Sequence, residues 1–281
     1  MITMKKLFAL LLALTALFSL SACGQKGLTI ALPNDPTNEG RALLLLEAKG
    51  LIKLKESAGL TATLQDILEN PYHISFKEAE AAQLPNLLKD VDFAVINTNY
   101  ALAAGLNPGR DALYMEGAVS PYVNILCVKE GRQNDPLVKA LAAALTSHQV
   151  VEHIRNKYDG QIVAAVEKES NGFDPSLDYG ALAGKSISVA ASPSPHADIL
   201  EVAKAILAEK NITLEIKSFE DYVLPNTVVE DGEIDANYFQ HLPYLNEFNE
   251  SRGTHLVSVA GIHIEPMSLY GGKQSSLDVF K

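Results

Sequence analysis

Short apolar runs alternate with helical patterns along most of the 281-residue chain, and this alternation constrains the fold more than any other feature. Strands and helices that alternate in this way build α/β folds, because each helix buries its apolar face against a sheet. The expected strands are residues 28–32, 73–76, 93–97, 123–129, 186–190, 214–219 and 256–264. The expected helices are residues 39–49, 64–69, 136–147, 150–157, 196–210, 222–230 and 243–250, the first of them capped by Asn38.

The N-terminal segment has the pattern of an export signal. Lys5 and Lys6 precede an apolar stretch over residues 7–20, and the stretch ends in Leu-Ser-Ala before Cys23. The apolar stretch is shorter than the roughly 20 residues that a membrane-spanning helix needs. The segment resembles a bacterial lipobox, which implies that residues 1–22 are removed and that Cys23 carries the lipid. An ordinary signal peptide with an incidental cysteine is the alternative. Cys127, in an apolar run, is expected to pack as a small hydrophobe.

Charge and missing motifs exclude several functions. The chain has 23 basic and 34 acidic side chains, a net charge of −11, which argues against a nucleic-acid partner. The sequence contains no H-E-x-x-H, C-x-x-C, G-x-S-x-G, P-loop or dinucleotide fingerprint. No other segment is apolar and long enough to span a bilayer. Because these motifs are missing, we expect no enzyme activity and no cofactor. Together with the expected lipobox, the sequence predicts a protein tethered by lipid to the extracytoplasmic face of the cell membrane.

One polar, turn-rich stretch, residues 167–184, is expected to be a linker between two parts that each contain strands and helices. The sequence thus predicts two α/β lobes. The cleft between such lobes commonly holds a small ligand.

Two polar segments follow expected strands of the first half. Asn38 and Arg41 lie three residues apart at the start of a helix, where free backbone N–H groups and a planar guanidinium suit a carboxylate. Asn97 and Asn99 end the next buried strand, where open α/β sheets bind ligands. Surface turns and simple helix caps are equally consistent with both segments.

The second half contributes rings and imidazoles. Tyr222, Phe239, His241 and Tyr244 can enclose an apolar or sulfur-bearing side chain, although core packing is the simpler alternative. His196 follows another strand in a Ser-Pro-Ser-Pro loop. A zinc site that combines His241, His255, His263 and Glu265 is disfavoured. His255 and His263 are eight residues apart, which is about 26 Å along a straight strand.

Several long motifs together resemble the methionine-binding lipoproteins of bacterial ABC importers. The motifs are L-S-A-C at 20–23, N-D-P-T-N-E-G-R-A-L-L-L-L-E at 34–47, E-A-A-Q-L-P at 80–85, A-V-I-N-T-N-Y-A at 94–101, S-P-Y-V-N at 120–124, P-H-A-D-I-L-E-V at 195–202, F-E-D-Y-V-L-P-N-T at 219–227, D-G-E-I-D-A-N-Y-F-Q-H-L-P-Y-L at 231–245 and H-I-E-P-M-S-L-Y at 263–270. In that family the half with F-Q-H-L-P-Y comes first, so the order here resembles a circular permutation bridged by residues 167–184.

The resemblance implies a two-lobed, periplasmic-binding-protein-like fold with a hinge and an interlobe cleft. One lobe would comprise residues 24–117 plus 268–281, with the tail paired beside strand 28–32, and the other would comprise residues 118–267. Arg41 would bind the ligand carboxylate with help from Asn38, and Asn97, with Asn99 less directly, would bind the head group. The residues implied around the ligand side chain are Tyr222, Phe239, His241 and Tyr244, with His196 and Tyr122 as weaker candidates.

The implied partners are methionine, the ABC importer permease with its ATPase, and the membrane through the lipid on Cys23. Three alternatives stay open: a receptor of the same family for another amino acid or a short methionine-containing peptide, a metal-binding receptor, and an enzyme.

Overall fold

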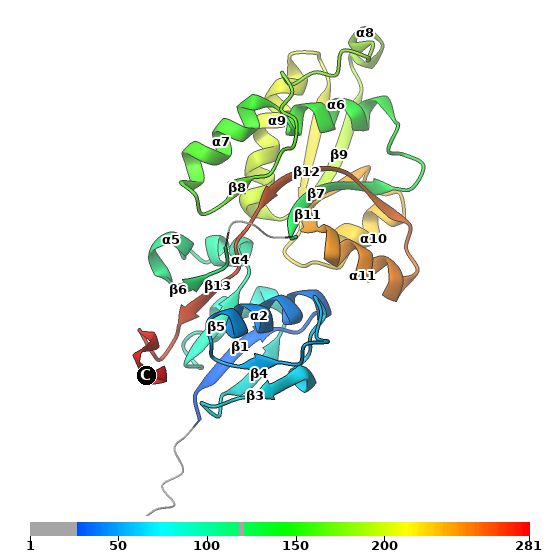
Figure 1. Cartoon of the computed structure of the whole chain (residues 1–281). Helices are drawn as coiled ribbons and strands as arrows, with labels where there is room; N and C mark the ends of the chain where they lie inside the picture. The colour runs from blue at the N-terminus through cyan, green and yellow to red at the C-terminus, as the bar shows by residue number, and fades with distance from the viewer. Residues whose placement is uncertain (1–26, 118–120) are drawn as a thin grey trace, which may run out of the picture.

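The computed structural model describes residues 27–117 and 121–281, so Cys23 and the expected signal lie outside the described residues. Two sheets organise the chain into two lobes, one below the other in Figure 1. The chain passes between the lobes twice, from β6 to β7 and from β12 to β13. This architecture confirms the α/β class. None of the helices in the described ranges has the length and apolar character needed to cross a membrane.

The lower lobe has a five-stranded sheet. Its strand order is β4 (Ser75–Ala79), β1 (Thr29–Pro33), β5 (Phe93–Ile96), β13 (Ser268–Gly271) and β6 (Ala112–Met115). Its helices are α2 (Pro36–Ala48), α3 (Leu84–Leu87), α4 (Thr98–Ala103) and α5 (Pro108–Asp111), and a small ribbon joins β2 (Lys53–Leu54) to β3 (Ile67–Glu69). Strand β1 is buried on both faces: Ile30 and Leu32 pack towards α2, and Ala31 packs on the opposite side. The lobe is therefore a layered α/β unit.

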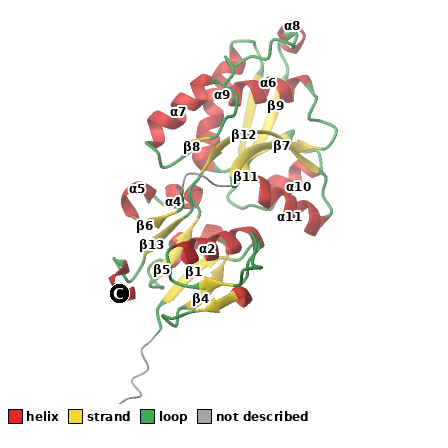
Figure 2. Cartoon of the chain, in the orientation of Figure 1, coloured by secondary structure: helices red, strands yellow, loops and turns green. Residues whose placement is uncertain are grey.

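The upper lobe has a six-stranded sheet. Its strand order is β10 (Thr213–Ser218), β9 (Ser186–Ala191), β11 (Ala236–His241), β7 (Val123–Lys129), β12 (Leu256–Ile264) and β8 (Val163–Ala164). Its helices are α6 (Pro136–Leu145), α7 (His148–Tyr158), α8 (Tyr179–Leu182), α9 (Asp198–Ala208), α10 (Leu224–Glu230) and α11 (Leu242–Arg252). Separate apolar clusters lie under α6, α7 and α9 and under α10 and α11, so helices cover both faces (Figure 2).

The C-terminal segment completes the lower lobe. Strand β13 pairs antiparallel with β5 and with β6. Phe280 at the end of the chain packs 5.3 Å from the ring of Phe93. The expectation that the tail pairs directly beside strand 28–32 is wrong, because β5 lies between β1 and β13. Strand β5 can take this central place because its four residues are all buried.

Each expected strand corresponds to an observed strand, but the helix expected over residues 64–69 is wrong. Leu64–Asp66 form a single 3₁₀ turn, and Ile67–Glu69 form β3. The side chain of Asp66 accepts hydrogen bonds from the backbone N–H and the hydroxyl of Thr63, at 3.0 and 3.1 Å. These bonds close one turn locally, and the segment is too short for a helix to propagate.

The cap of α2 also differs from expectation. Asp35, not Asn38, occupies the N-cap position, and its Oδ1 accepts the backbone N–H of Asn38 at 3.0 Å. Asp35 thereby supplies the acceptor that the first turn lacks. Asn38 lies inside the first turn, which leaves its side chain available to the interior.

Residues 167–184 connect β8 to β9, two strands of the same sheet. Leu182 is buried, and Phe173 and Tyr179 pack against the core of the upper lobe. This stretch therefore belongs to the upper lobe and does not lie between the lobes. The turn-rich composition of residues 167–184 gave no indication that Phe173, Tyr179 and Leu182 pack against this core.

Gly40 should be a sensitive position for stability, because α2 approaches the loop at Leu60 closely there. A methyl carbon added at Gly40 would lie 2.3 Å from the Leu60 carbonyl oxygen. We expect Gly40→Ala to lower the free energy of unfolding by about 1–3 kcal/mol. Gly59→Ala, whose added carbon meets nothing within 4 Å, is the matched control. Denaturant unfolding with equal stabilities of the two variants would contradict this packing.

Candidate functional site

A pocket lies where the two lobes meet, and polar and aromatic side chains line it. The lower lobe and the upper lobe both contribute, together with the segment that follows β12. The lining residues are Asn38, Arg41, Asn97, Thr98, Asn99, Asn124, Tyr222, Phe239, Gln240, His241, Tyr244 and Glu265. The structure therefore brings together eight of the ten ligand-binding residues expected from the sequence.

Arg41 is the cation of the pocket, and it is already paired. Its Nη2 donates to Glu116 at 2.5 Å and to the backbone oxygen of Glu265 at 2.7 Å, and its Nε donates to both Glu116 oxygens at 3.1–3.2 Å. The guanidinium carbon lies 4.1 Å from the ring centroid of Tyr122. Among the described residues no hydrogen bond engages Nη1, so that edge can serve a bound anion.

The asparagines of the lower lobe form a connected group. Asn97 donates through Nδ2 to Asn38 Oδ1 at 2.8 Å, and Asn38 in turn donates to the carboxylate of Asp35. Burial raises the pKa of Asp35, although its hydrogen bonds to Asn38 work in the opposite direction. Asn97 Oδ1 is buried and has no hydrogen-bond partner in the described part of the chain. This oxygen is an acceptor that a ligand N–H group can satisfy.

The rings of the upper lobe form the other wall. Tyr222 lies 5.9 Å from Phe239 and 5.8 Å from Tyr244, measured between ring centroids. Burial, and secondly the charge of Arg41, lower the pKa of His241, so its imidazole is neutral. Its Nδ1 accepts the backbone N–H of Tyr244 at 3.1 Å, which places the proton on Nε2. The wall is therefore apolar with one neutral polar edge.

Several hydrogen bonds hold the two lobes together around the pocket. The hydroxyl of Tyr222 donates to Asn99 Oδ1 at 2.7 Å, and the hydroxyl of Tyr100 donates to the backbone oxygen of Glu220 at 2.9 Å. The lobes thus lie in contact, and entry of a ligand requires these bonds to open.

Tyr122 and His196, the two weaker candidates, are not among the lining residues. Tyr122 lies between Arg41 and His241, with its ring 4.9 Å from that of His241. His196 contacts two lining residues, Asn124 Oδ1 at 2.9 Å and Glu265 Oε1 at 3.1 Å. Both residues therefore contact lining residues of the pocket without lining it themselves.

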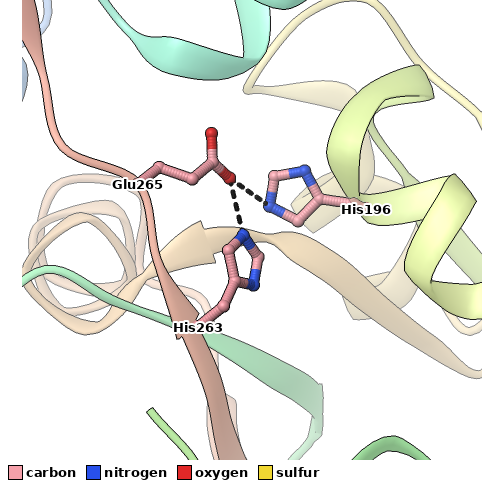
Figure 3. A group of neighbouring side chains, drawn as sticks. All are labelled: His196, His263 and Glu265. Atoms are coloured by element: carbon pink, nitrogen blue, oxygen red, sulfur yellow. Dashed lines mark hydrogen bonds and ion pairs between the residues drawn. The ribbon is translucent and has the colours of Figure 1, made fainter. Parts of the chain in front are cut away.

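His196, His263 and Glu265 form a cluster (Figure 3), and one of its members, Glu265, lines the pocket. His263 Nε2 is 2.8 Å from Glu265 Oε1, and its Nδ1 is 2.5 Å from the Tyr238 hydroxyl. The three side chains place one donor atom each within 4.8 Å, which metal ligation permits. Of the four residues weighed for zinc in the sequence, only His263 and Glu265 meet here. The absence of a metal site stays a prediction.

Burial sets the charges of this cluster. It lowers the pKa of His196 to about 3, so that imidazole is neutral. Burial alone would raise the pKa of Glu265, but His196, His263 and Arg41 outweigh it, and the pKa lies below its ordinary value. Glu265 is therefore an ionised carboxylate at neutral pH.

Four lining residues are not among the ligand-binding residues expected from the sequence: Thr98, Asn124, Gln240 and Glu265. Asn124 and Glu265 border the two passages of the chain between the lobes, as Figure 1 shows for β7 and β12. A polar residue at the edge of a long apolar run was the available signal for both. Glu116, the partner of Arg41, carried no such signal.

A pocket between two α/β lobes defines the class as a two-lobed, periplasmic-binding-protein-like fold. The chain belongs to the NlpA lipoprotein family, whose model matches residues 16–166 and 187–281.

Three relatives illustrate the similarity. The chain is 42% identical over 139 residues to the probable D-methionine-binding lipoprotein MetQ of Pasteurella multocida, with 50% of each chain covered. It is 44% identical over 141 residues to the D-methionine-binding lipoprotein MetQ of Escherichia coli K12, with 50% of this chain and 52% of that one covered. A solved nutrient binding protein from Burkholderia cenocepacia bound to methionine shares 50% identity over 50% of this chain and 59% of that one, with a TM-score of 0.48. The chain spans about half the length of the curated relatives it matches.

Stability should depend on pH through His196. Below its ordinary pKa near 6.5 the unfolded chain takes up a proton at His196, whereas the folded protein resists protonation down to about pH 3. Stability should therefore fall as the pH drops through this window, by about 1.4 kcal/mol per pH unit per proton. His196→Gln should flatten this dependence between pH 6.5 and 4.5 in denaturant unfolding.

The matched control is His148→Gln on the surface. A hydrogen bond to Glu169 raises the pKa of His148, so this group stabilises the fold at low pH, and its removal should steepen the decline. Identical slopes for wild type and His196→Gln would contradict the assignment of a buried neutral imidazole.

Proposed function

We propose that the protein is a lipid-anchored binding protein that captures methionine outside the cytoplasm and delivers it to an ABC importer. The observation that carries this proposal is the division of the pocket. Head-group residues lie on the lower lobe, whereas the rings lie on the upper lobe. A zwitterion with a thioether side chain matches both walls, because Arg41 suits the carboxylate and soft aromatic rings suit sulfur.

A ligand that contacts both lobes stabilises their closed arrangement. The Tyr222–Asn99 bond would open to admit the ligand and form again once the ligand fills the space between Arg41 and Phe239. The difference between the open and closed forms gives the permease, with its ATPase, a means to recognise the loaded protein. No catalytic step is assigned. A receptor for another amino acid or a methionine-containing peptide would use the same walls, whereas a metal receptor would use the cluster of His196, His263 and Glu265.

The permuted order of the halves is part of the proposal. The family match is interrupted at residues 167–186, and each relative named above aligns with about half of this chain. An exchange of the two halves of the sequence would account for the interruption of the family match and for the half-length alignments. Exchange is physically tolerable when the original ends lie close together on the surface.

Arg41→Ala should weaken methionine binding by about 2–5 kcal/mol, the cost of breaking a buried charge pair. Arg41→Lys should recover only part of the loss, because an ammonium cannot contact two partners as a planar fork does. Titration calorimetry measures both variants. Arg110→Ala, on an exposed surface, is the control. Unchanged methionine affinity in Arg41→Ala would show that Arg41 is not part of the site. A wild-type protein that binds no methionine would contradict the proposed function.

Cys23→Ser should abolish lipid attachment. The expected product is released from membranes in a cell fractionation experiment, because a serine hydroxyl cannot replace the thiol that carries the lipid. Cys127→Ser is the control and should stay with the membrane, since the Cys127 thiol is buried in the upper lobe. Membrane attachment of the Cys23→Ser protein would contradict the lipid anchor.

A further inference from the structure

We infer that Glu265 supplies the counter-charge for an ammonium group of the ligand, and that His196 and His263 are positioning residues that aim its carboxylate into the pocket. This inference rests on the proposed function and specifies it further: the ligand must carry a free amino group beside its carboxylate.

The two oxygens of Glu265 have different surroundings. Oε1 lies 2.8 Å from His263 Nε2 and 3.1 Å from His196 Nε2, so both imidazoles converge on one oxygen. Oε2 points away from both rings in Figure 3, and no described residue hydrogen-bonds to it. Since Glu265 lines the pocket, Oε2 is the oxygen that can face a ligand.

The two histidines fix the position of this carboxylate. Both are buried. His263 Nε2 hydrogen-bonds to Glu265 Oε1, whereas His196 Nε2 hydrogen-bonds to Asn124 Oδ1 at 2.9 Å and lies 3.1 Å from Glu265 Oε1. The second nitrogen of His263 meets the hydroxyl of Tyr238, which fixes the orientation of the ring. The imidazole of His196 is neutral, because burial lowers its pKa to about 3, so it leaves the negative charge of Glu265 in place.

Arg41, the cation that lines the pocket, is paired with another carboxylate and does not balance the charge of Glu265. The guanidinium of Arg41 forms an ion pair with the carboxylate of Glu116. The negative charge of Glu265 is therefore not neutralised by Arg41. Glu265 is only 6% exposed. An unpaired buried charge is costly, and a cation bound beside it removes that cost. A ligand ammonium is such a cation.

The placement of these charges fits an α-amino acid. Arg41 donates to the backbone oxygen of Glu265 at 2.7 Å, and both residues line the pocket, so the guanidinium lies beside the residue that carries the carboxylate. In an α-amino acid the carboxylate and the ammonium share one carbon, and they need complementary partners side by side. Asn97 Oδ1 is buried and has no hydrogen-bond partner among residues 27–117 and 121–281, so it is a second acceptor for the three N–H donors of an ammonium.

The experiment compares L-methionine with its 2-hydroxy acid analogue, which has the same thioether and carboxylate but no amino group. We expect wild type to prefer methionine by about 10- to 100-fold, the range for a charge-assisted hydrogen bond. Glu265→Gln should lose most of this preference: methionine affinity falls by a similar factor, whereas the affinity for the hydroxy acid changes little. Glu250→Gln, on the exposed end of α11, is the matched control.

The positioning residues have their own readout. His263→Gln and His196→Gln should reduce the ratio of methionine affinity to hydroxy acid affinity, whereas purely structural damage would weaken both ligands equally. If Glu265→Gln does not fold, the wild-type ratio and the two histidine variants still test the inference.

Three results would overturn it. Equal binding of methionine and the hydroxy acid by wild type would exclude an ammonium subsite. An unchanged ratio in folded Glu265→Gln would exclude Glu265 from that role. Stoichiometric Zn²⁺ binding by wild type that disappears in both His196→Gln and Glu265→Gln would make the cluster a metal site. In each case methionine binding itself can persist, so the proposed function is tested separately: it fails if wild type binds no amino acid.

Discussion

The structure depends on one charged junction between the lobes. Arg41 on α2 joins Glu116, at the end of the lower lobe's β6, to the backbone of Glu265, which follows the upper lobe's β12. Both passages of the chain between the lobes are therefore tied to a single guanidinium. Because Arg41 is 3% exposed, water hardly screens these contacts. The same group fixes the relative position of the lobes and gives the pocket its positive edge.

The polar network around this junction gives the site its selectivity. Asn38, Asn97 and Asp35 are joined by hydrogen bonds on the lower lobe, and His196, His263 and Glu265 lie together at the upper wall. Three atoms of these groups, Asn97 Oδ1, Glu265 Oε2 and His196 Nδ1, have no hydrogen bond to the described residues. Buried polar networks are rigid when most members are satisfied. The acceptor atoms without a hydrogen bond then require a ligand that supplies hydrogen-bond donors.

Local patterns determined how much of this could be predicted from the sequence. Strands β7 and β12 were predicted with their observed bounds, since each is a long apolar run. Strand β11 was missed because Asn237 and Gln240 make a fully buried strand look polar, and they are satisfied by Asn226 on α10. No spacing rule connects residues that meet only through tertiary packing, and this also explains why the pair Arg41–Glu116 was not foreseen. The aromatic wall could be predicted because its members lie close together in the sequence.

A crystal structure of the protein grown with methionine is the most direct test of the central claim, that the interlobe pocket is the methionine site. The account predicts density for one methionine in the pocket, with its carboxylate on the Nη1 edge of Arg41 and its thioether between Phe239 and Tyr244. An empty pocket at saturating methionine, or methionine bound elsewhere on either lobe, would contradict it.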